Sequence, residues 1–250
     1  MARALVTGGF GQIGSDLVPA LVERYRDHAD SCVVVLGHSR LPVTREQAAE
    51  RGFILETGDV RDGARMRELI QQHRITVVYH LASLLSAVGE RDPALTFDVN
   101  VNGLRVLLDV AVELGGQLRV FWASSIAVFG ASTPRDNTPQ DTVTAPSTMY
   151  GITKVTGELL CAYYHRRYGV DVRSLRYPGL ISWKEVPPTT TTSSNEIAGG
   201  SISIRYCTCR SSVLTSHVCR AGARRWHYRL CGCHLHRCTQ VELVSLLRPQ

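Results

Sequence analysis

The sequence predicts an α/β protein built on a doubly wound parallel sheet, and three observations lead to that prediction. Short apolar stretches alternate with helical patterns through the first 177 residues. These stretches are hydrophobic on both faces, as expected for a sheet that helices cover on both sides. Right-handed crossovers between consecutive parallel strands then produce a doubly wound order.

Each element follows from its local pattern. Runs of Val, Leu, Ile and aromatic residues predict strands at residues 4–7, 32–36, 52–55, 76–79, 118–123 and 170–175. Apolar residues at helical spacing predict helices at residues 13–26, 61–73, 94–114 and 149–168. No internal repeat interrupts the alternation.

The composition changes after Trp183. A stretch rich in Pro and Thr leads into a segment rich in Arg, Cys, His and Ser that has no clean periodicity. We therefore divide the chain into a folded domain, residues 1–184, and an irregular, poorly ordered tail, residues 185–250. Most of the formal charge of +6 belongs to the tail, because residues 1–184 hold 20 basic and 19 acidic residues. The tail arginines do not lie on one periodic face, so we expect no nucleic-acid partner.

The overall composition is that of an ordinary globular protein, with 44% hydrophobic and 20% charged residues. No apolar run approaches the roughly 18 residues of a membrane span. The first predicted strand begins almost at the N-terminus, which leaves no room for a signal or transit peptide. We therefore expect a cytoplasmic protein without a membrane partner; a mitochondrial location would need a presequence. Only two of the eight cysteines precede residue 185, as in a disulfide-free intracellular domain.

A glycine-rich turn follows the first predicted strand. The segment LVTGGFGQIG places Gly8, Gly11 and Gly14 around Gln12 and Ile13, and it opens a predicted helix. Such a turn lets backbone N–H groups approach a pyrophosphate, which the helix dipole also favours. The sequence therefore predicts a Rossmann-type domain that binds a nicotinamide dinucleotide, since the turn lies in a strand–turn–helix context.

The end of the second strand lacks the carboxylate that usually binds the adenosine ribose. His38 and Arg40 stand there instead, which either weakens NAD binding or suits the 2′-phosphate of NADP. Both residues also fit an ordinary loop. Asp59, which ends the third strand region, either reaches the adenine or caps the following helix. NAD is therefore the expected cofactor, with NADP still open.

A catalytic set follows the fifth strand. Ser125 ends that strand, and Tyr150 and Lys154 lie at positions i and i+4 of a predicted helix, on one face. A tyrosine has an ordinary pKa near 10 and is a poor base at neutral pH. We expect the Lys154 ammonium to lower the pKa of Tyr150, while Ser125 holds the substrate oxygen.

The segments LVTGGFGQIG, GDVRD, YHLAS, SSIAVFG, YGITK and LRYPGLISW resemble the extended short-chain dehydrogenase family over about residues 1–184. Within it, SSIAVFG and RYPGLISW are most similar to the epimerase-like L-threonine 3-dehydrogenases. The resemblance implies NAD-dependent oxidation of L-threonine to 2-amino-3-ketobutyrate, with Tyr150 as the general base. It places a further set of residues along the cofactor, namely Asp59, Val60, His80, Leu81, Ala82 and Pro178. It also implies weaker substrate contacts at Ser86, Ser124 and Tyr177.

The same resemblance implies a homodimer formed through the helices 94–114 and 149–168. Apolar Val106, Leu107, Val110 and Leu159 fit such an interface, and they fit equally well against the protein's own sheet. Two other activities fit the motifs: a nucleotide-sugar epimerase or dehydratase, and a non-catalytic dinucleotide-binding pseudoenzyme. Pro178 disfavours the sugar-nucleotide enzymes, which more often carry Asn there.

Three interpretations of the tail compete. Six cysteines from Cys207 to Cys238 suggest zinc, but their spacing is not that of a structural zinc site, so we expect no metal. A basic tail that binds RNA or lipid is the second. The third is a frameshifted or aberrantly spliced product, because codons for the segment from Trp226 onward, read one base later, permit a run GTIGYVAAISTDAL. This run resembles the C-terminal lobe of threonine dehydrogenases. On that interpretation the substrate lobe is absent or aberrant, and the enzyme is impaired or inactive.

Overall fold

The computed structural model describes residues 2–38, 41–134, 136–178, 180 and 213–215. Its strands form one parallel sheet in the order β3-β2-β1-β4-β5-β6-β7. The strands are β1 (Arg3–Thr7), β2 (Cys32–Gly37), β3 (Ile54–Thr57), β4 (Val77–His80), β5 (Arg119–Ser125), β6 (Asp171–Tyr177) and β7 (Val213–Thr215). The first six strands confirm the predicted strands and the doubly wound order.

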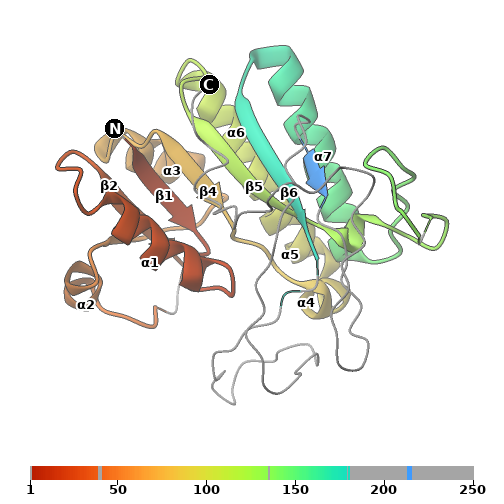
Figure 1. The fold of residues 1–250 in the computed structure, drawn as a ribbon, viewed down its shortest axis with the longest axis horizontal. Coiled ribbons are helices and arrows are strands. Elements are labelled where there is room, and N and C mark those ends of the chain that lie inside the picture. Colours follow the sequence, from red (N-terminus) through yellow and green to blue (C-terminus); the bar gives the residue numbers. More distant parts are fainter. Residues whose placement is uncertain (1, 39–40, 135, 179, 181–212, 216–250) are drawn as a thin grey trace, which may run out of the picture.

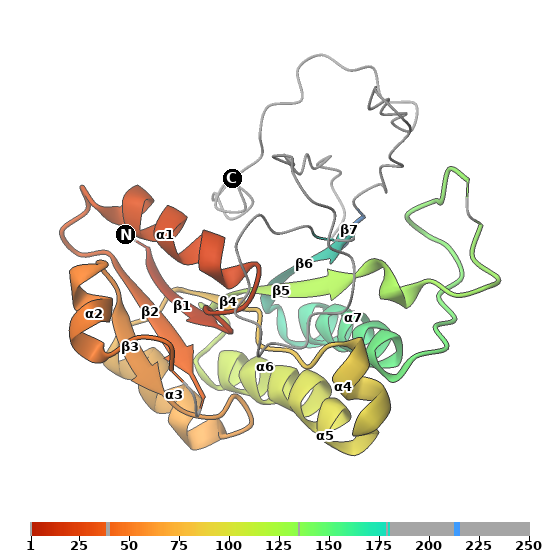
Figure 2. The same cartoon turned by 90° about the horizontal axis from the view of Figure 1, so that it is seen from below.

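Helices cover both faces of this sheet (Figures 1 and 2). One face carries α1 (Gly14–Tyr25), with α2 (Arg45–Glu50) near the β3 edge. The other face carries α3 (Gly63–Gln72), α6 (Gly103–Glu113) and α7 (Met149–Tyr168), with α4 (Ser86–Arg91) and α5 (Pro93–Phe97) beside them. Two hydrophobic clusters fill the layers between sheet and helices.

Strand β2 shows why the sheet is buried on both faces. Its sequence CVVVLG is buried from Val33 to Gly37. Val34 and Leu36 pack in the cluster under α3 and α6, whereas Val33 and Val35 pack in the cluster under α1. Successive side chains of a strand point to opposite faces, so a continuous apolar run requires helices on both sides.

The predicted helix over residues 94–114 is three segments in the structure. It consists of α5, a π-helical turn from Asp98 to Asn102, and α6. The wider turn moves the side chain of Asn100 into the interior, where it is 2% exposed. The π-turn divides the helix that periodicity predicted as continuous, and such turns within helices are frequent at functional sites.

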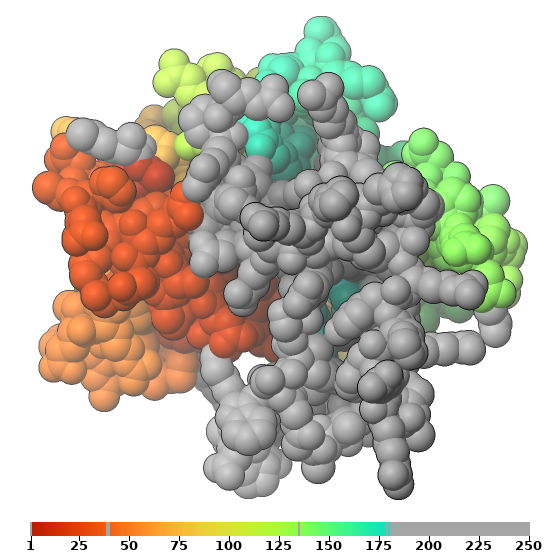
Figure 3. Space-filling view, viewed as in Figure 1, coloured from red at the N-terminus to blue at the C-terminus, as the bar shows by residue number. Residues whose placement is uncertain are grey.

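Helix α7 agrees with its predicted bounds and positions the catalytic residues. The Thr148 side chain accepts a hydrogen bond from the Gly151 amide at its start, and Gly169 in the left-handed conformation ends it. Gly157 lets α7 approach β5 closely, because a Cβ there would lie 2.4 Å from the Trp122 ring. The described residues between β5 and α7 project at the right-hand edge of the molecule (Figure 3).

Several other predictions are corrected. The sequence analysis missed α2 and α4, which are only six residues each. Strand β7 lies within the tail predicted to be irregular and pairs in parallel with β6. The rest of residues 185–250, including the cysteine cluster, lies outside the described residues. The predictions about a metal site and a substrate lobe fall on these residues.

Two absences hold for the described part of the chain. No helix in it is long and apolar enough to cross a membrane. No group of three or more His, Cys, Asp or Glu side chains in it is arranged to hold a metal ion.

Candidate functional site

The predicted site residues gather at the carboxyl edge of the sheet. Strands β1 to β6 are parallel, so their carboxyl ends lie along one edge. The predicted residues follow or end these strands: the glycines after β1, His38 after β2, Asp59 after β3, His80 at the end of β4, Ser125 at the end of β5 and Tyr177 at the end of β6. Ligands of doubly wound proteins bind outside this edge.

The glycine turn after β1 has no space for side chains. Gly8 has φ +68°, and a Cβ on it would lie 2.7 Å from the Ala82 nitrogen. A Cβ on Gly14 would lie 2.5 Å from the Gly8 oxygen, and one on Gly11 would lie 3.2 Å from the same atom. The glycines therefore allow the backbone of this turn to lie close to neighbouring backbone.

Helix α1 begins within this turn without a side-chain cap at Ile13, whereas side chains cap α2, α3, α5 and α7. The N-terminus of a helix is a favourable place for a phosphate, because the helix dipole is positive there. The side-chain amide of Gln12 donates a hydrogen bond to the carbonyl of Leu180, which follows β6, at 3.2 Å. The turn thus remains the predicted place for the pyrophosphate of a dinucleotide.

Thr7, His80 and Ala82 join the ends of β1 and β4. The Thr7 hydroxyl lies 3.0 Å from His80 Nδ1 and accepts a hydrogen bond from the Ala82 amide at 3.3 Å. Burial lowers the pKa of His80 to about 3, and the nearby Lys154 adds to this, so the ring is neutral. Its Nε2 is buried without a hydrogen-bond partner in the described chain. Leu81 and Ala82 are half-buried beside the turn, where the sequence analysis expected the cofactor.

The ends of β2 and β3 hold a charged cluster that the sequence did not predict. Arg61 contacts both Asp59 and Asp98, and His38 Nε2 lies 3.4 Å from Asp59 Oδ2. The hydrogen bonds from Arg61 lower the pKa of Asp59 to about 2, so its carboxylate is ionised. The carboxylate absent from the tip of β2 is therefore supplied next to it, from the end of β3.

The alternative role of Asp59 as a helix cap is wrong. Helix α3 begins at Gly63, and Asp62 caps it by accepting a hydrogen bond from the Arg65 amide at 3.0 Å. Asp59 instead accepts from the Arg61 backbone at 2.9 Å and from the Arg61 side chain. Val60, between Asp59 and Arg61, is buried. It packs closely against Gly103, since a Cβ on Gly103 would lie 2.9 Å from the Val60 side chain.

The structure brings Ser125, Tyr150 and Lys154 together. The Lys154 ammonium lies 5.3 Å from the centre of the Tyr150 ring and donates to the Ala123 carbonyl at 2.7 Å. Tyr150 and Ser125 share a hydrogen bond. Lys154 is 3% exposed, whereas Tyr150 is half-buried. A serine, a tyrosine and a lysine from the end of β5 and the start of α7 thus share one site.

The expected lowering of the pKa of Tyr150 by Lys154 is not found. Burial raises the pKa of Tyr150, and the hydrogen bond with Ser125 opposes this in part. Burial also lowers the pKa of Lys154 to about 7, so the amine is half neutral at pH 7. A partly neutral amine at this distance attracts a phenolate less than a full ammonium does.

The residues predicted on the substrate side differ in their surroundings. Ser86 is exposed at the start of α4, and Tyr177 is buried at the end of β6 with Pro178 after it. Ser124 is buried, and its hydroxyl donates to Glu158 at 2.6 Å. This hydrogen bond commits the Ser124 proton to Glu158.

Three residues of this region escaped the sequence analysis. Asn100 joins the loop after β4 to α7, because its side chain contacts the Leu84 backbone and Thr153 Oγ1. Glu158 and Arg176 form a buried ion pair between α7 and β6 at 2.7 Å. The sequence does not show their partners, which lie far from them along the chain.

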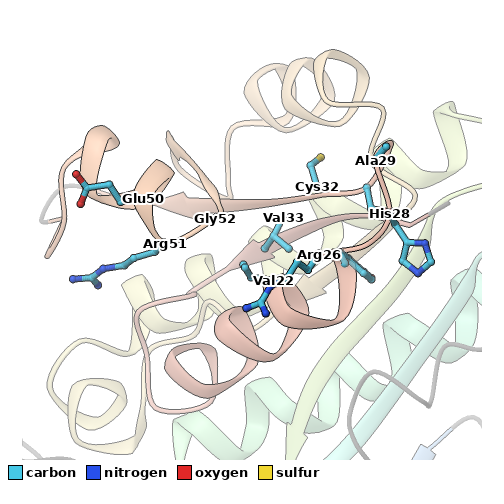
Figure 4. A pocket seen from close by; sticks show the side chains of 11 residues that line it. Val22, Arg26, His28, Ala29, Cys32, Val33, Glu50, Arg51 and Gly52 are labelled. Carbon is cyan, nitrogen blue, oxygen red and sulfur yellow. The ribbon is translucent and has the colours of Figure 1, made fainter.

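A separate hollow of about 450 Å³ lies at the opposite edge of the sheet (Figure 4). Residues of α1 and the start of β2 line it, with Glu50, Arg51 and Gly52 from the segment before β3. None of the predicted site residues borders it. It is therefore distinct from the candidate site at the carboxyl edge.

Comparisons with known proteins agree with this geometry. The chain matches the NAD dependent epimerase/dehydratase family over residues 4–198, beyond residue 184, where the sequence analysis ended its resemblance. An uncharacterized epimerase/dehydratase from Staphylococcus saprophyticus is 42% identical over 197 residues, which are 77% of this chain and 58% of that protein.

Two solved structures are similar in fold and sequence. A monomeric L-threonine 3-dehydrogenase from a metagenome is 42% identical, with a TM-score of 0.66 over 74% of this chain and 56% of its own. An L-threonine dehydrogenase from Phytophthora infestans is 43% identical, with a TM-score of 0.64 over 75% of this chain and 57% of its own. The chain thus spans little more than half the length of these relatives. Its fold, glycine turn and sequence establish that the chain belongs to the NAD dependent epimerase/dehydratase family.

Proposed function

We propose that the chain acts as an NAD-dependent oxidoreductase of the L-threonine 3-dehydrogenase type. The observation that carries this proposal is the meeting of Ser125, Tyr150 and Lys154 at the sheet edge that also holds the glycine turn. The identities of 42% and 43% to two threonine dehydrogenases support the choice of substrate.

The proposed reaction oxidises the Cβ–OH group of L-threonine to a ketone. Bound NAD supplies the hydride acceptor for the hydrogen on Cβ. Tyr150 Oη, as phenolate, takes the hydroxyl proton, so the substrate loses one hydride and one proton and becomes 2-amino-3-ketobutyrate. Ser125 Oγ orients the substrate oxygen. Its hydrogen bond with Tyr150 places it beside the proposed base.

The chain's own groups fit a dinucleotide at three points. The turn from Gly8 to Gly14 would hold the pyrophosphate, and Asp59 and Val60 would lie by the adenosine. Leu81, Ala82, Lys154 and Pro178 would line the nicotinamide end, with Ser86 and Tyr177 toward the substrate. A bound positive nicotinamide would also favour the Tyr150 phenolate, against the effect of burial.

A second candidate is a nucleotide-sugar epimerase or dehydratase. The matched family carries that name, as does the Staphylococcus saprophyticus relative. Both candidates use the same turn, serine and tyrosine, so substrate trials distinguish them. NADH formation that depends on L-threonine supports the dehydrogenase, and turnover of UDP-glucose without net NADH formation supports the epimerase.

A third outcome is dinucleotide binding without turnover. NADH binding measured by fluorescence, together with inactivity toward both substrates, would identify a non-catalytic dinucleotide-binding protein and overturn the proposed activity. No binding of NADH by the folded chain would contradict the whole proposal. Cell fractionation tests the accompanying expectation of a cytoplasmic protein.

We further propose that two copies associate through α7. Leu107 and Val110, which fitted the interface by sequence, are instead buried in the chain's own core. Ile152, Leu159 and Tyr163 form the apolar stripe that supports the proposal, with exposed fractions of 43%, 66% and 47%. Light scattering tests it: the wild type is expected to be dimeric and Leu159→Glu monomeric, whereas a monomeric wild type would contradict it.

A further inference from the structure

Glu158 lies at a buried junction behind the catalytic residues. Its carboxylate accepts hydrogen bonds from Ser124 Oγ at 2.6 Å and from Arg176 Nε and Nη2 at 2.7 Å each. The side chains of Arg176 and Glu158 are only 8% and 10% exposed. Ser124 and Arg176 stand opposite each other in the β5–β6 register, so one carboxylate joins both strands to α7.

Every member of this junction is next to a residue of the candidate site. Ser124 precedes Ser125 in β5, and Arg176 precedes Tyr177 in β6. Glu158 lies one helical turn after Lys154 on α7, at position i+4. The junction therefore fixes the two strand ends against the helix that carries Tyr150.

The junction also holds the segment between β5 and α7. Arg176 Nη1 donates to the Gln140 carbonyl at 3.1 Å, and the guanidinium lies 5.3 Å from the centre of the Phe129 ring. The guanidinium thus contacts both α7 and the segment between β5 and α7. All three contacts use one rigid, planar group.

Stability alone is a weak reason for such an arrangement. A buried ion pair loses hydration, and apolar residues of similar volume often replace one without loss of stability. Breaking one side of the pair leaves a buried charge and destabilises strongly. A buried pair can instead fix one conformation, and here the fixed groups adjoin the catalytic set.

We infer that Glu158 is a positioning residue, which sets Ser125 against Tyr150 through its contacts with Ser124 and Arg176. This inference rests on the proposed function, because it assigns a role in that same site. The groups around Tyr150 are Lys154 on its own helix, Ser125 of β5 and, on α4, Glu90, whose carboxylate accepts from the Met149 amide at 2.9 Å. Of these contacts, the junction controls the one between Ser125 and Tyr150.

The first test compares Ser124→Ala and Glu158→Gln in the full chain. Ser124→Ala keeps the ion pair and removes only the hydrogen bond to β5. We expect kcat to fall about tenfold in Ser124→Ala and about 10²-fold in Glu158→Gln, since small misplacements near the chemistry have such effects. The Kd for NADH is expected to stay unchanged in both variants, because the glycine turn is elsewhere.

Glu56→Gln is the matched control. Glu56 is also a carboxylate with little exposure, 13% for the side chain, and it has two partners, Arg65 at 2.8 Å and His73 at 2.9 Å. It joins β3 to α3, away from the catalytic set. This variant is expected to lose stability without a change in kcat. Equal losses of kcat in Glu56→Gln and Glu158→Gln would overturn the positioning role.

A second measurement needs no turnover and so separates this inference from the proposed function. NMR of isotope-labelled tyrosine, with Tyr150→Phe for assignment, gives the pKa of Tyr150 in each variant. The Ser125 hydrogen bond lowers this pKa, so its loosening in Ser124→Ala and Glu158→Gln is expected to raise it.

The inference and the proposed function fail on different results. A Tyr150 pKa that is the same in wild type, Ser124→Ala and Glu158→Gln would overturn the inference, even if L-threonine is oxidised. A raised pKa in the two junction variants would support it, even if the wild type does not turn over L-threonine and the proposed function fails.

Discussion

The side chain of Asn100 bonds to both backbone groups of Leu84. Its Oδ1 accepts from the Leu84 amide at 2.7 Å, and its Nδ2 donates to the Leu84 carbonyl at 3.0 Å. The same Nδ2 donates to Thr153 Oγ1 at 3.2 Å, and Thr153 in turn donates to the Tyr150 carbonyl at 2.7 Å. One amide therefore joins the loop after β4 to the catalytic turn of α7.

Asn100→Ala is expected to lower the free energy of unfolding by about 1–3 kcal/mol, because it leaves partly buried groups of Leu84 without partners. Turnover is expected to fall with it. Urea unfolding and steady-state kinetics check both. Asn102→Ala, whose amide bonds only to Asp98 at 2.9 Å, is the control and is expected to change stability by about 0.5 kcal/mol or less. Equal effects of the two substitutions would contradict the role of Asn100.

Gly14→Ala is expected to weaken dinucleotide binding about 10- to 100-fold. The new Cβ would lie 2.5 Å from backbone atoms of Gly8 and Gly9, so the phosphate-binding turn must shift at a cost of about 1–3 kcal/mol. Calorimetric titration with NADH measures the change. Gly63→Ala is the control, because its Cβ would meet no atom nearer than 3.5 Å. Unchanged affinity in Gly14→Ala would place the pyrophosphate elsewhere.

The ionised Asp59 beside His38 is expected to favour NAD over NADP, since a carboxylate repels the extra 2′-phosphate. Asp59→Asn should therefore improve the affinity for NADP relative to NAD about tenfold. His38→Asp should lower the Kd for NAD by adding an acceptor for the ribose hydroxyls. The Kd values for both dinucleotides check this. A preference for NADP in the wild type would show that Asp59 does not face the ribose phosphate.

Lys154 predicts a pH dependence of stability. Its folded pKa of about 7 lies below its ordinary value of 10.5, so the unfolded chain binds more protons between these values. Stability from this group therefore rises with pH from about 7 to 10.5, and its destabilising effect is complete below pH 7. Relative to Lys154→Met, the wild type should gain stability as the pH rises through this window. A difference in unfolding free energy that is constant with pH would contradict the low pKa.

NMR can measure the pKa of Lys154 directly, because the chain contains only two lysines, Lys154 and Lys184. Lys154→Met identifies its signal by loss. A pKa near 10 would mean that the ammonium is better solvated than its burial implies.

Much of the fold could be predicted because its signals are local. The valine run of β2 and the apolar periodicity of α1 each depend on neighbouring residues, and both elements were found where expected. The glycine turn and the Tyr150–Lys154 spacing are local in the same way. Parallel strands then bring their ends to one edge, so a site at that edge followed from the topology.

The unpredicted features depend on contacts between distant residues. Glu158 meets Ser124 and Arg176 across 34 and 18 positions, and Arg61 meets Asp98 across 37. Spacing along one helix does not reveal such partners. The π-turn contains Asn100, whose side chain contacts Leu84, and such a tertiary contact leaves no signal in the periodicity that predicted one continuous helix.

The central claim is that Tyr150 removes the hydroxyl proton of L-threonine while NAD is reduced. The most direct test is NADH formation by the full chain with L-threonine and NAD, in wild type and Tyr150→Phe, after both are shown to bind NADH equally. The account predicts turnover in the wild type and a loss of about 10²-fold or more in Tyr150→Phe, the effect of removing a general base. Equal turnover in the two proteins, or none in a wild type that binds NADH, would contradict it.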